Sequence, residues 1–63
     1  MKLHFKLTVN ENGEVVAAAS TSKTTTTDQR IINQAKSAIM RQVRYNKDPG
    51  SGLVIQYLTI GIS

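Results

Sequence analysis

The chain has 63 residues, which is enough for a single domain, residues 1–63, and leaves little interior for a deep, enclosed active site. Its hydrophobic fraction of 40% and charged fraction of 19% are typical of a globular chain. The sequence has no cysteine, which excludes disulfides and thiolate metal sites, and one histidine with four acidic residues is too few for most metal sites. We therefore expect no metal, no cofactor and no enzymatic activity.

Eight Lys and Arg residues against four Asp and Glu give a net charge of +4, which permits an anionic partner. The basic residues are spread along the chain, and their only cluster, Arg41, Arg44 and Lys47, lies where a helix would end and would complement the helix dipole. Aromatic side chains that stack on bases are few. Nucleic-acid binding is therefore the least favoured function that we consider.

No segment approaches the ~20 apolar residues of a membrane span, and the first residues alternate instead of forming a signal peptide. We expect a soluble domain that is either the whole protein or a piece of a larger one.

Two strands joined by a tight turn are predicted at the start of the chain. Residues 2–9 alternate strictly between apolar and polar side chains, which is typical of a half-buried strand. Residues 10–13 carry the Asn and Gly of a hairpin turn, and residues 14–20 return as the second strand. The buried face of this second strand stays open, because apolar residues occur on both sides: Val15, Ala17 and Ala19 on one, Val16 and Ala18 on the other. Its small alanines indicate that a bulky element packs close to it.

A helix is predicted from Asp28 to about Arg44. Thr26 and Gln29 fit a capping box, with Asp28 in the first turn. The apolar residues then follow the helical period on one stripe: Ile31, Ile32, Ala35, Ala38, Ile39 and Val43. The turn residues 48–52 end this segment, and a third strand is predicted from Leu53 to about Ile62.

The direction of the elements predicts the topology. The helix runs back over the sheet, so the third strand is antiparallel to the first and lies beside it. We therefore expect an α+β fold with ββαβ topology, in which a three-stranded antiparallel sheet in the order 2-1-3 is covered on one face by one helix.

The third strand is apolar on both faces, and one helix can cover only one of them. Its second apolar row, Leu53, Ile55 and Tyr57, has no predicted partner within the chain. The strand also contains no charge and no proline, the usual protections of a free edge. We therefore predict that it binds a partner strand, with Gln56 and Tyr57 contributing selectivity. The predicted binding residues are Leu53, Val54, Ile55, Gln56, Tyr57, Leu58 and Thr59.

No other feature of the sequence indicates a catalytic or ligand-binding site. His4 lies on the polar face of the first strand with no acid or nucleophile near it in the sequence, so we expect a solvated surface histidine. The glycines fit turns and form no phosphate-binding pattern. The four consecutive threonines, 24–27, fit a capping and connecting loop better than a phosphorylation target.

Three segments, FKLTVNENGEVVAAAS, TTTTDQRIINQAKSAIMRQVRYNKDP and GLVIQYLTI, together resemble the C-terminal domain of TonB-like proteins, most closely those of Bacteroidetes. The matching positions are Phe5, Val9, Gly13, Val15 or Val16, Asp28, Ala35, Ala38, Tyr45, Gly52, Val54 and Leu58. The chain departs from the family pattern in its short loop at 48–52 and at Gln56, where an aromatic residue is usual. It also has no anchor helix or Pro-rich spacer, so the resemblance is to a domain of an energy transducer.

The resemblance implies a periplasmic module at the end of an inner-membrane-anchored protein. Such a module binds the N-terminal box of an outer-membrane TonB-dependent transporter by strand addition and relays force derived from the proton gradient. Its only link to the membrane would be an anchor in the parent protein. Two alternatives remain: a structural domain that forms homodimers, and a small basic nucleic-acid-binding domain.

Overall fold

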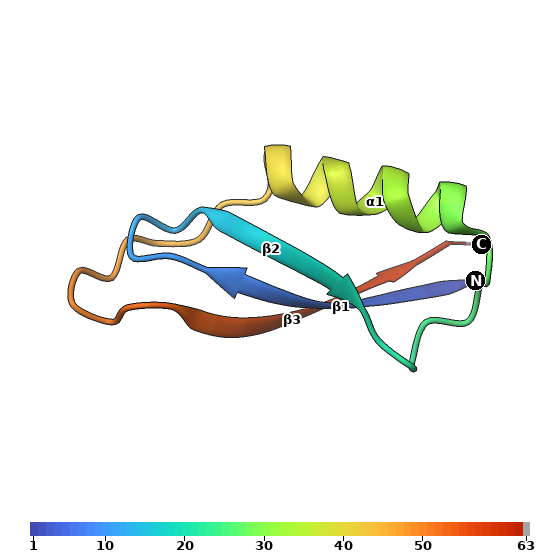
Figure 1. Ribbon diagram of the computed structural model, residues 1–63, viewed down its shortest axis with the longest axis horizontal. Coiled ribbons are helices and arrows are strands. Elements are labelled where there is room, and N and C mark those ends of the chain that lie inside the picture. Colours follow the sequence, from blue (N-terminus) through green and yellow to red (C-terminus); the bar gives the residue numbers. More distant parts are fainter. Residues whose placement is uncertain (63) are drawn as a thin grey trace.

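The computed structural model describes residues 1–62 and contains four elements in the order β1 (Lys2–Val9), β2 (Val15–Ser20), α1 (Gln29–Gln42) and β3 (Val54–Gly61). The strands form one antiparallel sheet in the order β2-β1-β3. The helix lies across one face of this sheet (Figure 1). The predicted α+β fold, its ββαβ topology and its strand order are therefore confirmed. Over these 62 residues, no helix has both the length and the apolar character needed to span a bilayer.

The central strand β1 supplies most of the core. The inward side chains of Leu3, Phe5 and Leu7 are almost completely buried, as the alternation in the sequence predicts. The other buried side chains are Val9 and Val15 from the sheet and Ile32 and Ile39 from the helix. No polar or charged side chain of the described residues is buried. The fold is thus held by apolar contacts between β1 and the predicted stripe of α1.

A β-bulge settles which face of β2 is buried. Thr8 pairs with Ala17 and Val9 pairs with Val15, so Val16 has no partner on β1. The extra residue shifts the alternation, and Val15 and Ala18 both lie on the helix side while Val16 is exposed. The buried face of β2 therefore takes one residue from each of the two apolar rows that the sequence offered, Val15 from the first and Ala18 from the second.

The helix begins and ends differently from the prediction. Its N-cap is Asp28, whose Oδ1 accepts a hydrogen bond from the Arg30 amide at 3.0 Å. Thr26, predicted as the cap, lies outside the helix, and its hydroxyl accepts from the Asp28 amide. The helix ends at Gln42 because the chain becomes extended at Val43, and Arg44 forms an antiparallel bridge with Glu14. Glu14 is the residue just before β2.

The connection from α1 to β3 is fastened to the turn between β1 and β2. The Tyr45 amide donates to the carbonyl oxygen of Gly13 at 2.8 Å, and the Asp48 amide donates to that of Glu11 at 2.9 Å. Gly13 has a φ of +82° and lies directly against the Tyr45 backbone. This contact requires glycine, both for the left-handed conformation and for the close approach.

We expect Ile39→Ala to lower the free energy of unfolding by about 2–5 kcal/mol, because it leaves a cavity between the helix and the buried side chains of β1. Met40→Ala is the matched control, since Met40 neighbours Ile39 on α1 but is exposed; it should cost about 0.5 kcal/mol or less. Urea denaturation measures both. Equal losses would show that the helix face is wrongly assigned.

We expect Gly13→Ala to destabilise the fold by at least about 3 kcal/mol, since its Cβ would overlap the carbonyl oxygen of Tyr45 in addition to the strain of a positive φ. Gly50→Ala is the control: Gly50 also has a positive φ, of +90°, but nothing lies within 4 Å of its added Cβ. That variant should lose only about 1–2 kcal/mol. Thermal unfolding of both variants tests whether the contact with Tyr45, and not backbone strain alone, holds the connection in place.

Candidate functional site: the open edge of β3

The sheet has two edges, and they are protected very unequally. The β2 edge is six residues long, carries the bulge at Val16 and has the helix packed against it. Short edge strands, bulges and covering helices all hinder the addition of another strand. The β3 edge is eight residues long, pairs with β1 without a bulge, and has no charged residue or proline. Strand addition is therefore far easier at β3.

The hydrogen-bond register shows which backbone groups of β3 are free. Met1 and Ile62 exchange two hydrogen bonds of 2.8 Å, so they form a hydrogen-bonded pair. In an antiparallel ladder such pairs recur at every second residue. The N–H and C=O groups of Val54, Gln56, Leu58 and Ile60 therefore point to β1, and those of Ile55, Tyr57, Thr59 and Gly61 point outward. The outward row offers alternating donors and acceptors to another strand.

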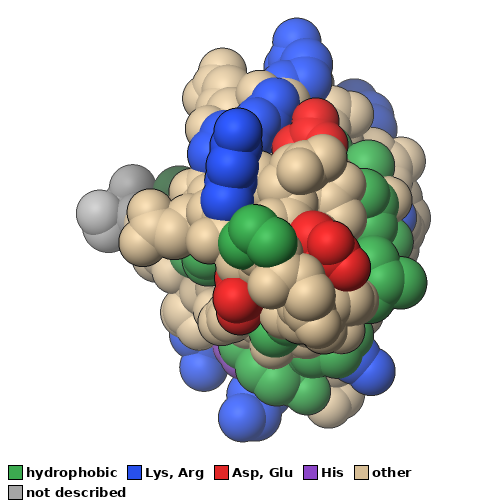
Figure 2. Space-filling model, turned by 90° about the vertical axis from the view of Figure 1, so that its left-hand side faces the viewer, with side chains coloured by type: hydrophobic (Ala, Val, Ile, Leu, Met, Phe, Trp, Pro, Cys, Tyr) green, Lys and Arg blue, Asp and Glu red, His purple; other side chains and the backbone are tan. Residues whose placement is uncertain are grey.

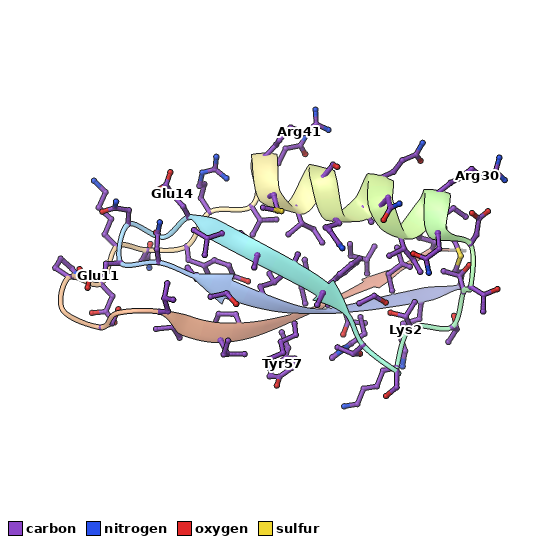
Figure 3. The ribbon with its side chains drawn as sticks, in the orientation of Figure 1. Lys2, Glu11, Glu14, Arg30, Arg41 and Tyr57 are labelled. Atoms are coloured by element: carbon purple, nitrogen blue, oxygen red, sulfur yellow. The ribbon has the colours of Figure 1, made fainter. Side chains whose placement is uncertain are left out.

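The second apolar row of β3 lies exposed on the sheet face opposite the helix. Ile55 is 44% exposed, Tyr57 61% and Leu53, just before the strand, 68%. Figure 3 shows Tyr57 pointing away from the helix layer. Because the one helix covers only the other face, residues 1–62 leave this row largely exposed.

A groove runs along the other face of β3, between this strand and the helix. It has a volume of about 210 Å³ and is lined mainly by Ala35, Ala38 and Gln42 of α1 and by Leu58 and Ile60 of β3. The groove exists because the helix backbone lies closest to β2, where the side chains are small, and so stands away from β3. The alanines of β2 indicated a close neighbour in the sequence, but not the space left on the far side.

The predicted binding residues thus divide by role. Ile55, Tyr57 and Thr59 present both backbone groups and exposed side chains to a partner at the edge. The backbone N–H and C=O groups of Val54, Gln56 and Leu58 are hydrogen-bonded to β1. The side chains of these residues lie on the helix side of the sheet. Leu53 precedes the strand and is the most exposed of these residues.

Threonines after β2 protect part of β1, a role that sequence reasoning missed. The Thr24 hydroxyl accepts from the His4 amide at 2.9 Å and donates to the His4 carbonyl at 3.0 Å, and Thr25 bonds the Lys2 backbone in the same way. These side chains replace the strand that β2 is too short to provide. The connecting loop was predicted, but its pairing with β1 depends on where the loop lies in space.

His4 is less solvated than the sequence predicted. It is half-buried, its Nδ1 lies 2.6 Å from the Thr21 hydroxyl, and its ring stacks on Tyr57 with centroids 5.7 Å apart. Within residues 1–62 no carboxylate bonds to this group. Glu11 and Glu14 lie at the hairpin end (Figure 3), which is the end that faces the viewer in Figure 2 and where acidic side chains gather. Among residues 1–62, no three His, Asp or Glu side chains are grouped so that they could hold a metal ion.

Comparison of the chain with models of protein families, with curated proteins and with solved structures finds no match. The resemblance to TonB-like domains therefore rests on the order and spacing of the sequence segments alone.

We expect Thr24→Val to lower the free energy of unfolding by about 1–3 kcal/mol, because valine keeps the shape but leaves the His4 amide without its acceptor, while the His4 carbonyl keeps the Thr21 amide as a donor. Thr27→Val is the control at an exposed position of the same run and should change stability by about 0.5 kcal/mol or less. Hydrogen exchange at the His4 amide should accelerate only in Thr24→Val. Unchanged protection of that amide would contradict the edge-covering role.

Proposed function

We propose that this protein is a non-enzymatic interaction module that captures an extended segment as an additional strand beside β3. The observation that carries the proposal is the edge itself: eight residues without charge, proline or bulge, with the backbone groups of Ile55, Tyr57, Thr59 and Gly61 directed outward. Such an edge is a template for β-augmentation.

The two faces beside the edge support the same function. A strand added to β3 would alternate its side chains between the helix side and the opposite face. On the helix side the groove between α1 and β3 offers about 210 Å³ for apolar side chains. On the opposite face Ile55 and Tyr57 offer exposed apolar surface. Backbone pairing would therefore be joined by apolar burial on both faces, which favours a partner strand that is apolar toward the helix.

The resemblance to TonB-like C-terminal domains suggests the partner: the N-terminal box of an outer-membrane TonB-dependent transporter. In that setting the chain would be the periplasmic end of an inner-membrane-anchored protein and would relay force derived from the proton gradient. The uncharged edge also favours a second occupant, the β3 strand of another copy, because two such strands meet without like-charge repulsion. The alternative function is therefore a structural homodimerisation domain.

Proline substitutions at adjacent residues of β3 test the proposal. Tyr57→Pro removes an outward-facing N–H, so we expect a folded protein whose affinity for a TonB-box peptide falls at least about tenfold. Gln56→Pro removes an N–H that pairs with Leu7, so it should unfold a domain whose whole stability is about 5 kcal/mol. Circular dichroism measures folding, and isothermal titration calorimetry measures peptide binding.

Tyr57→Thr is the matched control for Tyr57→Pro, because it also removes the tyrosine ring but keeps the backbone N–H and a high strand propensity. It should bind the peptide within about threefold of the parent if backbone pairing dominates. Sedimentation of the parent chain without peptide distinguishes the homodimer, which Tyr57→Pro should dissociate. Peptide binding or self-association that Tyr57→Pro leaves unchanged would overturn the proposal that β3 is the interface.

A further inference from the structure

The sheet face opposite the helix carries an open depression that shares only Tyr57 with the surface proposed for strand capture. Its volume is about 560 Å³, within the range of small-molecule sites. Three separate parts of the chain form it: β1, the turn after β2, and β3. The lining residues are His4, Lys6, Thr21, Ser22, Lys23 and Tyr57.

The depression is cationic without a compensating acid. Lys6 and Lys23 line it, both are exposed, and no carboxylate is among the lining residues. Within residues 1–62 the one salt bridge joins Arg30 to Asp28 at the start of the helix, so neither lysine is neutralised by a carboxylate of this part of the chain. Two lysines from different parts of the chain line the same space, which favours an anion.

The hydrogen bonds around His4 leave polar groups open to a ligand. The Thr21 hydroxyl oxygen accepts from the Lys23 amide at 3.2 Å and lies 2.6 Å from His4 Nδ1, so it occupies one nitrogen of the ring. No hydrogen bond of the described residues engages Nε2 or the Ser22 hydroxyl, so both are available to a ligand.

The Tyr57 ring gives the depression an apolar wall. It stacks on His4 with an interplanar angle of 24° and keeps 61% of its surface exposed. A bare phosphate ion would contact only part of a 560 Å³ space, whereas a planar group would also cover the ring. We infer that this depression binds a small organic anion, a phosphate or carboxylate attached to a planar or apolar group.

Phenyl phosphate is the probe, and amide chemical shifts in two-dimensional NMR give its position and affinity. We expect saturable shifts at His4, Lys6, residues 21–23 and Tyr57, and binding at least about fivefold tighter than that of inorganic phosphate. Benzoate serves as the carboxylate arm, and the tighter of the two aromatic ligands identifies the preferred anion. Shifts spread over the whole surface, or equal affinity for phenyl phosphate and inorganic phosphate, would overturn the inference.

Charge removal tests the site against non-specific attraction. The double variant Lys6→Ala/Lys23→Ala should weaken phenyl phosphate binding roughly tenfold. The control Lys36→Ala/Lys47→Ala removes the same two charges elsewhere and should leave the affinity within about twofold. Equal weakening in both variants would mean that net charge, and not this depression, attracts the ligand.

Tyr57→Thr tests the aromatic wall. It should reduce the affinity for phenyl phosphate to that for inorganic phosphate while the lysines remain. An undiminished preference for phenyl phosphate would contradict the role of the ring. The lysine variants leave the backbone of the β3 edge intact, so this inference and strand capture can fail independently of each other.

Discussion

One helix of fourteen residues has to cover the inner face of a three-stranded sheet, and its position decides the rest of the molecule. The helix packs closely over β2, where Ala18 contributes little volume, and its Ile32 and Ile39 reach the buried side chains of β1. The fully buried core therefore consists of side chains from β1, β2 and α1, and none from β3. Because close packing on one side moves the helix away from the other, β3 keeps a half-covered inner face and an open groove.

The unpaired backbone of a small sheet tends to pair with other strands, and the described residues limit this along β1 and β2 but not along β3. The bulge at Val16 distorts β2, and Arg44 pairs with Glu14 just before that strand. Thr24 and Thr25 bond the part of β1 that β2 does not reach. Each arrangement uses a local hydrogen bond or a change of register and needs no additional strand. By contrast, β3 has neither a bulge nor a charged residue, and this difference supports the proposal that its edge binds a partner strand.

The two faces of the sheet differ in character as well as in cover. The inner face is apolar and meets the helix, whereas the outer face combines lysines with His4 and Tyr57. Acidic side chains gather instead at the end formed by the loops (Figure 2). Tyr57 is common to the strand edge and to the cationic depression, since its backbone faces outward while its ring lies over the outer face of β1.

The sequence by itself determined the elements, their order and the apolar stripe of the helix, because alternation and helical period are local properties of the chain. The strand order 2-1-3 followed from direction and connection alone. The uncovered row at Ile55 and Tyr57 was also predictable, since a strand that is apolar on both faces exceeds what one helix can cover. Only the tertiary structure decided the bulge at Val16 and the stack of His4 on Tyr57. These two features depend on contacts between residues far apart in the chain, whose register no local pattern specifies.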